Sequence, residues 1–370
     1  MKKVLVAIAI TTLAFGQWSS TSPTQTTVPR FAYVPNRSTN NVSAFTINAA
    51  SGALSAIPGS PFSAASGPVS AAVDPKGHFL YVADLGSFQV SAYRINQTTG
   101  SLLEVPGSPF AAGENPHSVA ISPSGQFLYV LDTFTSPQNG QIEVFSINPS
   151  TGVITLISGS PFPAGILPVS IGFTQNGRLA YVADLGSNQA LGYSVNTNTG
   201  ALTALAGSPY PAGTFPESVA IENLSRSVYV ANQSNDISGY HIKATGDLKA
   251  IPGSPFPSGG TIPLSIAVDA QHFFAYVAND VSANLTGFKI DQHNGVLHPI
   301  AGSFATGSAP VSVVVDPSNT FVYVVNSGSG NISSYTINPT TGMLTEILGS
   351  PFPVDGIEPS SIAITRGPAN

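Results

Sequence analysis

The chain has 370 residues, of which only 8% are charged, and its formal net charge is −6. Binding to nucleic acid requires a basic stripe, and the 12 lysines and arginines are too few to form one. The chain has no cysteine, which excludes disulfide bonds and attachment of a lipid through sulfur. The surface must therefore be mostly Ser, Thr, Asn, Gln and Gly, which suits neutral partners outside the cell.

The N-terminal segment has the pattern of an export signal. Met1, Lys2 and Lys3 precede a short apolar run over residues 4–15, and Gly16 ends an acceptable cleavage site. The run is too short to cross a bilayer. We expect residues 1–16 to be a signal peptide and residues 17–29, rich in Ser, Thr, Pro and Gln, to be a disordered tether. The mature protein is then expected to be a soluble monomer in the periplasm or outside the cell.

A motif that ends in Tyr-Val-x-Asp/Asn recurs roughly every 48 residues, and a period in the forties with several short strands per unit is typical of a β-propeller. Its tyrosines are Tyr33, Tyr81, Tyr129, Tyr181, Tyr229, Tyr276 and Tyr323. The sequence therefore predicts an all-β, seven-bladed β-propeller.

Each repeat predicts four antiparallel strands, and the second copy places them at 68–73, 79–84, 90–95 and 102–110. The first two are continuous apolar runs, as expected where neighbouring blades cover both faces of a sheet. The last runs into Gly-Ser-Pro-Phe, and proline lacks an N–H donor, so this strand should form the outer edge. The aromatic residue beside the proline is expected to pack between blades.

A glycine precedes each last strand, where a tight turn requires positive φ. These glycines are Gly52, Gly100, Gly152, Gly200, Gly246, Gly295 and Gly342. The first repeat, which begins at residue 30, has no inner strand, whereas residues 360–365 form a spare one. We therefore expect the C-terminal strand to complete blade one and close the ring, which gives a propeller over 30–366 and a tail over 367–370.

The repeat resembles that of a known family. Its pattern is Pro-x-Ser-Val-Ala-x-x-Pro-x-Gly-x-Phe-Leu-Tyr-Val-Ala-Asp, then Val-Ser-x-Tyr-x-Ile-Asn and Thr-Gly-x-Leu. It is similar to the seven-bladed lactonase family, which includes 6-phosphogluconolactonases and carboxymuconate cyclases, and to the YVTN propellers of surface layers. The resemblance covers residues 30–365 and implies the propeller fold, with either lactone hydrolysis or binding in the cell envelope.

Strand order assigns residues to the two faces of the ring. The inner strands begin and the second strands end on one face, which we call the upper face. One ring on it follows the inner-strand proline: Val69, His117, Val169, Glu217, Leu264, Val311 and Ser360. A second ring ends the second strands: Asn36, Asp84, Asp132, Asp184, Asn232, Asn279 and Asn326.

His117 is the most informative of these residues. Pro116-His117 looks like the family's Pro-His at the channel mouth, where an imidazole can take a proton from a water that attacks a lactone. The same blade has an insertion at residues 135–140, and insertions in repeat proteins tend to mark the working face. The alternative is a structural histidine that bonds a neighbouring loop.

The Asp/Asn ring also has two interpretations. Short polar side chains at strand ends can close turns through backbone N–H groups. Alternatively Asp84, Asp132 and Asp184, with Glu114 and Glu217, form an acidic sector that raises the pKa of His117 or holds a cation. We assign no metal and no cofactor. The serine that follows each proline by two positions, such as Ser70, is expected to be structural because seven equivalent copies exist.

Two functions remain open at this stage. In the first, a small neutral lactone is hydrolysed with His117 as general base, Glu217 or Asp132 orienting it and Arg37 stabilising the oxyanion. Asp84, Asp184 and Glu114 then contact the ligand, and their charge should repel a phosphorylated substrate. Pro168-Val169-Ser170 stands where the family resemblance implies an Arg-His pair. In the second, the propeller binds an envelope protein or glycan and has no catalytic activity.

Overall fold

The computed structural model describes residues 30–133, 140–224, 226–271 and 273–365. The predicted signal peptide (1–16), tether (17–29) and tail (367–370) lie outside the described residues, as does the insertion except for Gly140. No helix in the described part is long and apolar enough to span a bilayer.

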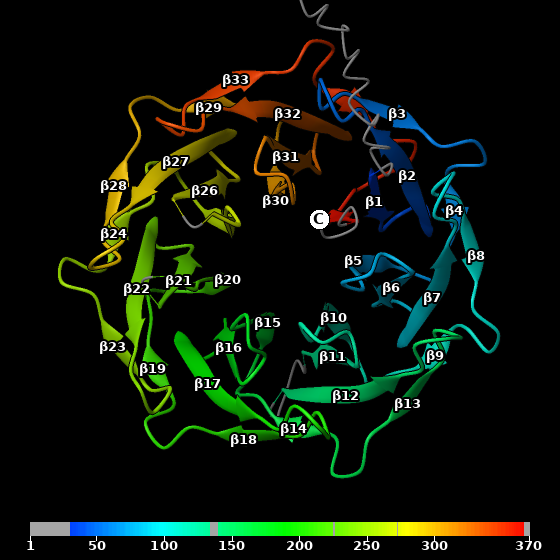
Figure 1. Cartoon of the computed structure of the whole chain (residues 1–370), viewed down its shortest axis with the longest axis horizontal. Coiled ribbons are helices and arrows are strands. Elements are labelled where there is room, and N and C mark those ends of the chain that lie inside the picture. Colours follow the sequence, from blue (N-terminus) through cyan, green and yellow to red (C-terminus); the bar gives the residue numbers. More distant parts are fainter. Residues whose placement is uncertain (1–29, 134–139, 225, 272, 366–370) are drawn as a thin grey trace, which may run out of the picture.

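The described residues form seven antiparallel sheets that radiate from a common axis (Figure 1). The inner strands are β35 (Ala363–Ile364), β5 (Pro68–Val73), β10 (Pro116–Ile121), β15 (Pro168–Phe173), β20 (Pro216–Glu222), β25 (Pro263–Val268) and β30 (Pro310–Val315). The second strands are β1 (Arg30–Asn36), β6 (Phe79–Asp84), β11 (Phe127–Asp132), β16 (Leu179–Asp184), β21 (Ser227–Asn232), β26 (Phe274–Asn279) and β31 (Phe321–Asn326). The third strands are β2 (Asn41–Ile47), β7 (Gln89–Ile95), β12 (Gln141–Ile147), β17 (Gln189–Val195), β22 (Asp236–Ile242), β27 (Asn284–Ile290) and β32 (Asn331–Ile337).

The outer strand of each blade is divided into two short pieces that pair with the same third strand. The first pieces are β3 (Leu54–Ala56), β8 (Leu102–Glu104), β13 (Ile154–Leu156), β18 (Leu202–Ala204), β23 (Leu248–Ala250), β28 (Leu297–Pro299) and β33 (Leu344–Glu346). The second pieces are β4 (Phe62–Ser63), β9 (Phe110–Ala111), β14 (Phe162–Pro163), β19 (Tyr210–Pro211), β24 (Phe256–Pro257), β29 (Phe304–Ala305) and β34 (Phe352–Pro353). The predicted fourth strand is therefore interrupted around its Gly-Ser-Pro segment, on the outer edge as expected.

The C-terminal strand closes the ring, which confirms the prediction. β35 pairs with β1 through Ala32 with Ile364 and Tyr33 with Ala363, and an isolated bridge joins Asn36 to Pro359. Figure 1 shows this strand, in red, beside the blue β1 on the inner side of blade one. The first and last segments of the propeller thus share one sheet.

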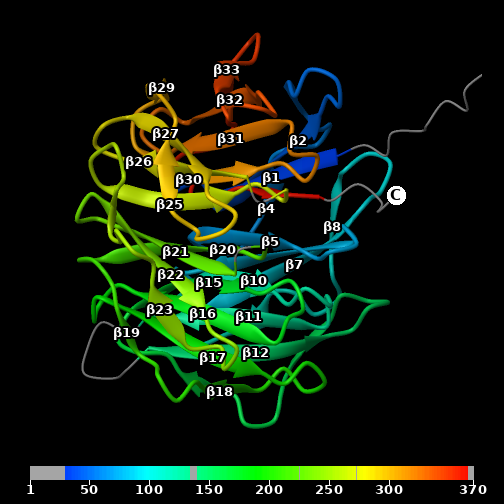
Figure 2. The same ribbon diagram turned by 60° about the vertical axis from the view of Figure 1, so that its left-hand side comes forward.

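The core lies between blades. Seven apolar clusters of the described residues each combine side chains of two adjacent sheets, and one joins blade seven to blade one. Figure 2 shows the sheets stacked around the ring. Phe62, beside the outer-strand proline, packs against the cluster between blades one and two, as predicted for this repeated aromatic position. Burial between sheets explains why the second strands are apolar on both faces.

One hydrogen bond is repeated at every blade interface. The buried hydroxyl of the second-strand tyrosine donates to the carbonyl of the turn glycine in the next blade. The distances are 2.6 to 2.9 Å for Tyr33 with Gly100, Tyr81 with Gly152, Tyr129 with Gly200, Tyr181 with Gly246, Tyr229 with Gly295, Tyr276 with Gly342 and Tyr323 with Gly52. The repeated tyrosine and the repeated turn glycine therefore form one hydrogen-bonded pair that joins each blade to the next.

The turn glycine is required for two reasons. At Gly100 the backbone has φ of +73°, and a Cβ would lie 2.4 Å from the ring of Phe31. Positive φ costs an L-residue roughly 1–2 kcal/mol, and the clash adds to it because the ring is packed in the interface. The glycine therefore permits the close approach that the tyrosine hydrogen bond needs.

Gly100→Ala should lower the free energy of unfolding by about 3 kcal/mol, because it adds an interface clash to the cost of positive φ. Gly330→Ala is the matched control: φ is +62°, and its Cβ meets nothing within 4 Å. The control should lose only about 1 kcal/mol. Urea unfolding of both variants measures the difference. Equal losses would show that the steric contact at Gly100 is unimportant.

Candidate functional site

A cavity of about 700 Å³ occupies the upper mouth of the channel. All seven residues that follow the inner-strand proline line it, and six of the inner-strand serines lie beside them. These are the residues of the first predicted ring, so the structure brings that ring together at one place.

A β-bulge aims these side chains at the axis. In blade three, Pro116 is paired with Asp132 and Ser118 with Leu131, which leaves His117 as the extra residue. The same register shift occurs in blades two and four to seven. A bulged residue has no partner across the ladder, and its side chain takes a new direction. The six bulges therefore turn a structural repeat into a ring of side chains around one cavity.

A second set of lining residues comes one position after the Asp/Asn ring. Arg37, Gln233, Asp280 and Ser327 line the cavity from four blades. Each donates its backbone N–H to the carbonyl that precedes the inner-strand proline, as Gln233 does to Phe215 at 3.0 Å. The backbone of this second set is therefore held by the same segment that forms the bulge.

His117 is half-buried in the mouth, and its pKa lies below the ordinary value of 6.5. Burial is the main cause, and the positive charge of Arg37 adds to it, while an interaction with the Val169 backbone acts in the opposite direction. Its Nδ1 is buried without a hydrogen-bond partner among the described residues. The alternative in which an acidic sector raises this pKa was wrong, because burial and the positive charge of Arg37 lower it.

Glu217 has a pKa above its ordinary value because it is buried, and the hydrogen bond from Gln233 opposes that increase. Gln233 Nε2 donates to Glu217 Oε1 at 2.5 Å. Gln233 was not singled out from the sequence, although it follows Asn232 directly. The amide holds the carboxylate in one orientation and favours its charged form.

Arg37 is exposed at the mouth, and it is the one Lys or Arg among the residues that line this cavity. Glu358 is also exposed there and accepts a hydrogen bond from Ser38 Oγ at 2.6 Å. Burial raises the pKa of Asp280, a third lining acid that the sequence pattern did not reveal. The lining acids Glu217, Asp280 and Glu358 therefore outnumber the arginine.

The Asp/Asn ring does not reach the cavity. All seven side chains are fully buried, and none is among the lining residues, so Asp84, Asp132 and Asp184 are separated from the ligand space. Asp84 Oδ2 accepts from Ser91 N at 2.8 Å, and Asp184 Oδ1 accepts from Leu167 N at 2.7 Å. Glu114 is exposed and also outside the lining set. The buried contacts match the turn-closing interpretation.

Asp132 differs from the rest of this ring. Neither carboxylate oxygen has a well-aligned hydrogen bond within the described ranges. Burial, with the nearby charge of Glu143, raises its pKa to about 8, while an interaction with the Gln141 side chain acts in the opposite direction. Burial also raises the pKa of Glu143, which accepts from Gly113 N at 2.8 Å. In blades one and two, Ser43 and Ser91 take the position of Glu143 and bond the ring residue. The surroundings of Asp132 therefore favour its protonated form.

The inner-strand serines link neighbouring blades. Ser70 Oγ accepts from Val119 N of the next blade at 3.2 Å, and Ser170 Oγ accepts from Val219 N at 3.1 Å. Ser218, Ser265 and Ser361 make the same contact with their next blades. These bonds give the repeated serine a structural role, as expected from its equivalence in all blades.

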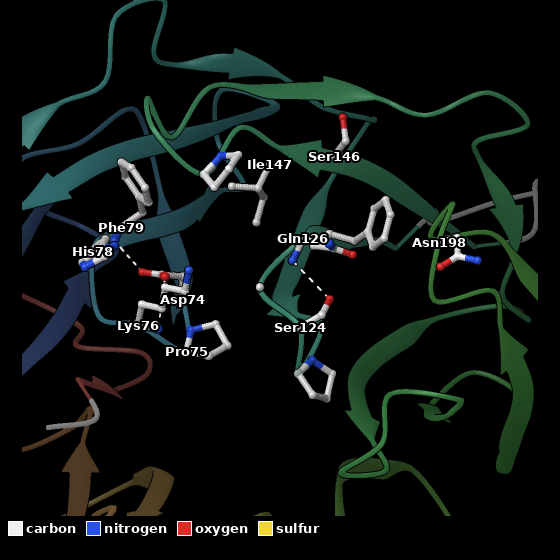
Figure 3. A pocket seen from close by; sticks show the side chains of 14 residues that line it. Asp74, Pro75, Lys76, His78, Phe79, Ser124, Gln126, Ser146, Ile147 and Asn198 are labelled. Atoms are coloured by element: carbon white, nitrogen blue, oxygen red, sulfur yellow. Dashed lines mark hydrogen bonds between the residues drawn. The ribbon is translucent and has the colours of Figure 1, made fainter. Parts of the chain in front are cut away.

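The described residues contain no group of three or more His, Cys, Asp or Glu side chains placed to hold a metal ion. The lower face has cavities of its own, and Figure 3 shows one of about 660 Å³ between blades two and three. Its Asp74 and Ser124 accept turn N–H groups of Phe79 and Gln126 at 2.6 and 3.3 Å, and exposed Lys76 and His78 lie at its rim. The upper cavity is the better candidate site. Titratable side chains from several blades face it, and they are not used to close turns as Asp74 is on the lower face.

Comparison with known proteins agrees with the seven-bladed propeller fold. The sequence matches the family described as "Lactonase, 7-bladed beta-propeller" over residues 24–115, 104–215 and 170–357. A candidate 6-phosphogluconolactonase from Bacteroides fragilis superposes with a TM-score of 0.76 at 18% identity, covering 93% of this chain and 100% of that one. A periplasmic gluconolactonase from Pseudomonas aeruginosa gives 0.75 at 17%, covering 92% and 100%. No curated protein matches the sequence. At these identities the structures support the fold alone.

Asp132→Asn should gain stability relative to the parent as pH rises from 4 to 8. Between its ordinary value of 3.8 and about 8, the unfolded chain releases a proton that the folded chain keeps, so folding becomes less favourable as pH increases. Asparagine removes this dependence and already occupies the position in four blades. We expect a gain of about 2 kcal/mol at pH 8 and little at pH 4 by urea unfolding.

Asp184→Asn is the matched control for that experiment. It places an amide donor where Asp184 accepts N–H groups from Ile166 and Leu167, so it should lose stability at pH 8. An Asp132→Asn effect that does not change with pH would contradict the assignment of Asp132 as a protonated buried acid.

Proposed function

Because the chain belongs to the seven-bladed β-propeller lactonase family, we propose that it hydrolyses a neutral lactone at the upper mouth of its channel. The observation that carries this proposal is the placement of His117, Glu217 and Arg37 around one cavity. The family alone does not decide the activity, since one fold hosts many functions.

His117 serves as general base in this proposal. Because its pKa lies below the ordinary value, the imidazole is neutral at pH 7 and can accept a proton from water. The hydroxide adds to the lactone carbonyl, and the ring C–O bond of the tetrahedral intermediate then breaks. The leaving alkoxide takes the proton back from the imidazolium, which gives a hydroxy acid and restores the base.

Arg37 and Glu217 supply the remaining roles. The exposed guanidinium of Arg37 stabilises the oxyanion in this proposal. Its positive charge contributes to the lowered pKa of His117, which supports its placement near the base. Glu217, held by Gln233, orients the attacking water or the imidazolium. Asp132, Asp84, Asp184 and Glu114 have no part in this mechanism, because they lie outside the lining set.

The charges of the mouth favour a neutral substrate. Glu217, Asp280 and Glu358 line the cavity with Arg37 as its one permanent cation. A phosphate group carries about two negative charges at neutral pH and is repelled by such a surface. The proposed substrate is therefore an uncharged lactone, in a location outside the cytoplasm, as the periplasmic relative from Pseudomonas aeruginosa suggests.

The first test is hydrolysis of neutral and phosphorylated lactones, followed by pH-stat, with the chain from Gln17 and its His117→Ala variant. Neutral lactones should be turned over, and kcat/KM should fall about 100-fold or more in the variant. In the parent, kcat/KM should fall on acidification with a midpoint below about 6.5, because a base with a lowered pKa stays active to lower pH.

The matched control for that test is His78→Ala, which removes an exposed histidine from the lower face. It should retain full activity. No turnover of any lactone above background would refute the hydrolase proposal and leave binding of an envelope protein or glycan as the function to pursue.

Gln233→Ala should shift the acid limb of the pH profile. Without the amide, the pKa of Glu217 rises further, so the carboxylate is lost at higher pH and activity near pH 5 falls about tenfold more than activity near pH 8. Ser327→Ala, at the equivalent position of blade seven, is the control and should leave the profile in place. A uniform loss across pH in Gln233→Ala would indicate a merely structural role.

A further inference from the structure

Exposed apolar side chains gather beside the upper mouth. Phe215 is 47% exposed, Val281 62% and Ile357 61%. Each is close in sequence to a cavity residue: Ile357 directly precedes Glu358, Val281 follows Asp280, and Phe215 lies two positions before Glu217. An exposed apolar surface next to a polar cavity is typical of a ligand-binding rim.

Apolar residues continue from this rim into the cavity. Ile262, Leu264 and Val311 line it from blades six and seven. Val281 is tied to the segment that carries Ile262, since its N–H donates to Thr261 O at 3.2 Å. We call Phe215, Ile262, Leu264 and Val281 the apolar stripe. Ile262 and Leu264 line the cavity from blade six, Val281 is bonded to the adjoining segment, and Phe215 occupies on blade five the position that Ile262 has on blade six.

Two members of the apolar stripe occupy unfavourable backbone conformations. Phe215 has φ of +52° and Ile262 has φ of +55°, at the position where Gly67, Ala309 and Glu358 of other blades also have positive φ, of +67°, +50° and +57°. A β-branched or bulky residue in this region is a true outlier, and such strain persists mainly at functional sites. Positive φ at this position is therefore a feature of the repeat, and what is particular to blades five and six is the large apolar side chain placed there.

We propose that the substrate is a neutral lactone whose ring carries an alkyl chain, and that the chain lies on the apolar stripe while the ring occupies the cavity. This inference rests on the proposed lactone hydrolysis and adds its substrate class. The apolar stripe is continuous with the cavity lining, and the acids of that lining exclude an anionic substituent. The exposed apolar area favours an alkyl chain over the hydroxyl groups of a sugar lactone, which would lose hydration there.

The test compares γ-butyrolactone with γ-decalactone, the same ring bearing a hexyl chain. We expect kcat/KM to be at least about tenfold higher for the substituted ring, since each methylene removed from water favours binding. The double variant Phe215→Asn and Val281→Ser should reduce that ratio to about one. Leu103→Ser is the control: this residue is 69% exposed on the outer strand of blade two, and its loss should leave the ratio unchanged.

A second measurement does not depend on turnover. Binding of 2-pyrrolidinone and of its 5-hexyl derivative, lactams that replace the ring ester by a stable amide, is followed by calorimetry. The hexyl lactam should bind at least about tenfold more tightly to the parent and lose that advantage in the double variant. Tight binding of the hexyl lactam without hydrolysis of any lactone would support the apolar stripe and overturn the hydrolase proposal.

A different set of results would reject the alkyl-chain inference without rejecting lactone hydrolysis. Equal kcat/KM for the two lactones, with equal lactam affinities and no effect of the double variant, would overturn the alkyl-chain inference while leaving lactone hydrolysis intact. A higher kcat/KM for gluconolactone than for γ-decalactone would overturn it as well.

Discussion

The hydrogen bond from each second-strand tyrosine to the turn glycine of the next blade is the constraint on which the rest of the structure depends. Its donor is fully buried, and its acceptor lies on a positive-φ backbone next to a packed side chain, where a Cβ would clash. A buried donor without this partner would be costly. Tyr323 bonds Gly52 across the seam, so the same contact that joins successive blades also closes the ring.

This frame determines how the mouth is built. Because the sheets are held at fixed positions by repeated residues, the start of each inner strand can depart from regular pairing. The bulge uses that freedom in blades two to seven and directs one side chain per blade to the axis. The framework residues are nearly identical in all blades, whereas the bulged residues differ, and the chemistry resides in those differences. His117 and Glu217 are ionisable where the other bulged positions carry valine or leucine.

The sequence predicted the fold well and the site only partly. The difference arises because the fold is encoded by repeated residues, whereas the site is encoded by single ones. Strands, turn glycines, outer-edge prolines and closure by residues 360–365 are repeated or complementary, so each copy supports the others. The Asp/Asn ring was placed beside the mouth because it ends the second strands, but side chains alternate along a strand. One position further on, Gln233 and Asp280 face the cavity while Asn232 and Asn279 are buried. The lowered pKa of His117 depends on burial across blades, which no local pattern contains.

The same difference between framework residues and mouth residues explains why proteins that share this fold need not share a substrate. Relatives near 18% identity superpose over almost their full length, since interface tyrosines, glycines and apolar strands are enough to build the ring. The mouth is built from single residues that can change without disturbing those contacts. In this chain the mouth has three lining acids, one arginine and an adjoining apolar stripe. Acids repel phosphate, and apolar surface gains little from a hydroxylated ring. Both effects support the proposal of an uncharged, partly apolar lactone over a phosphorylated sugar.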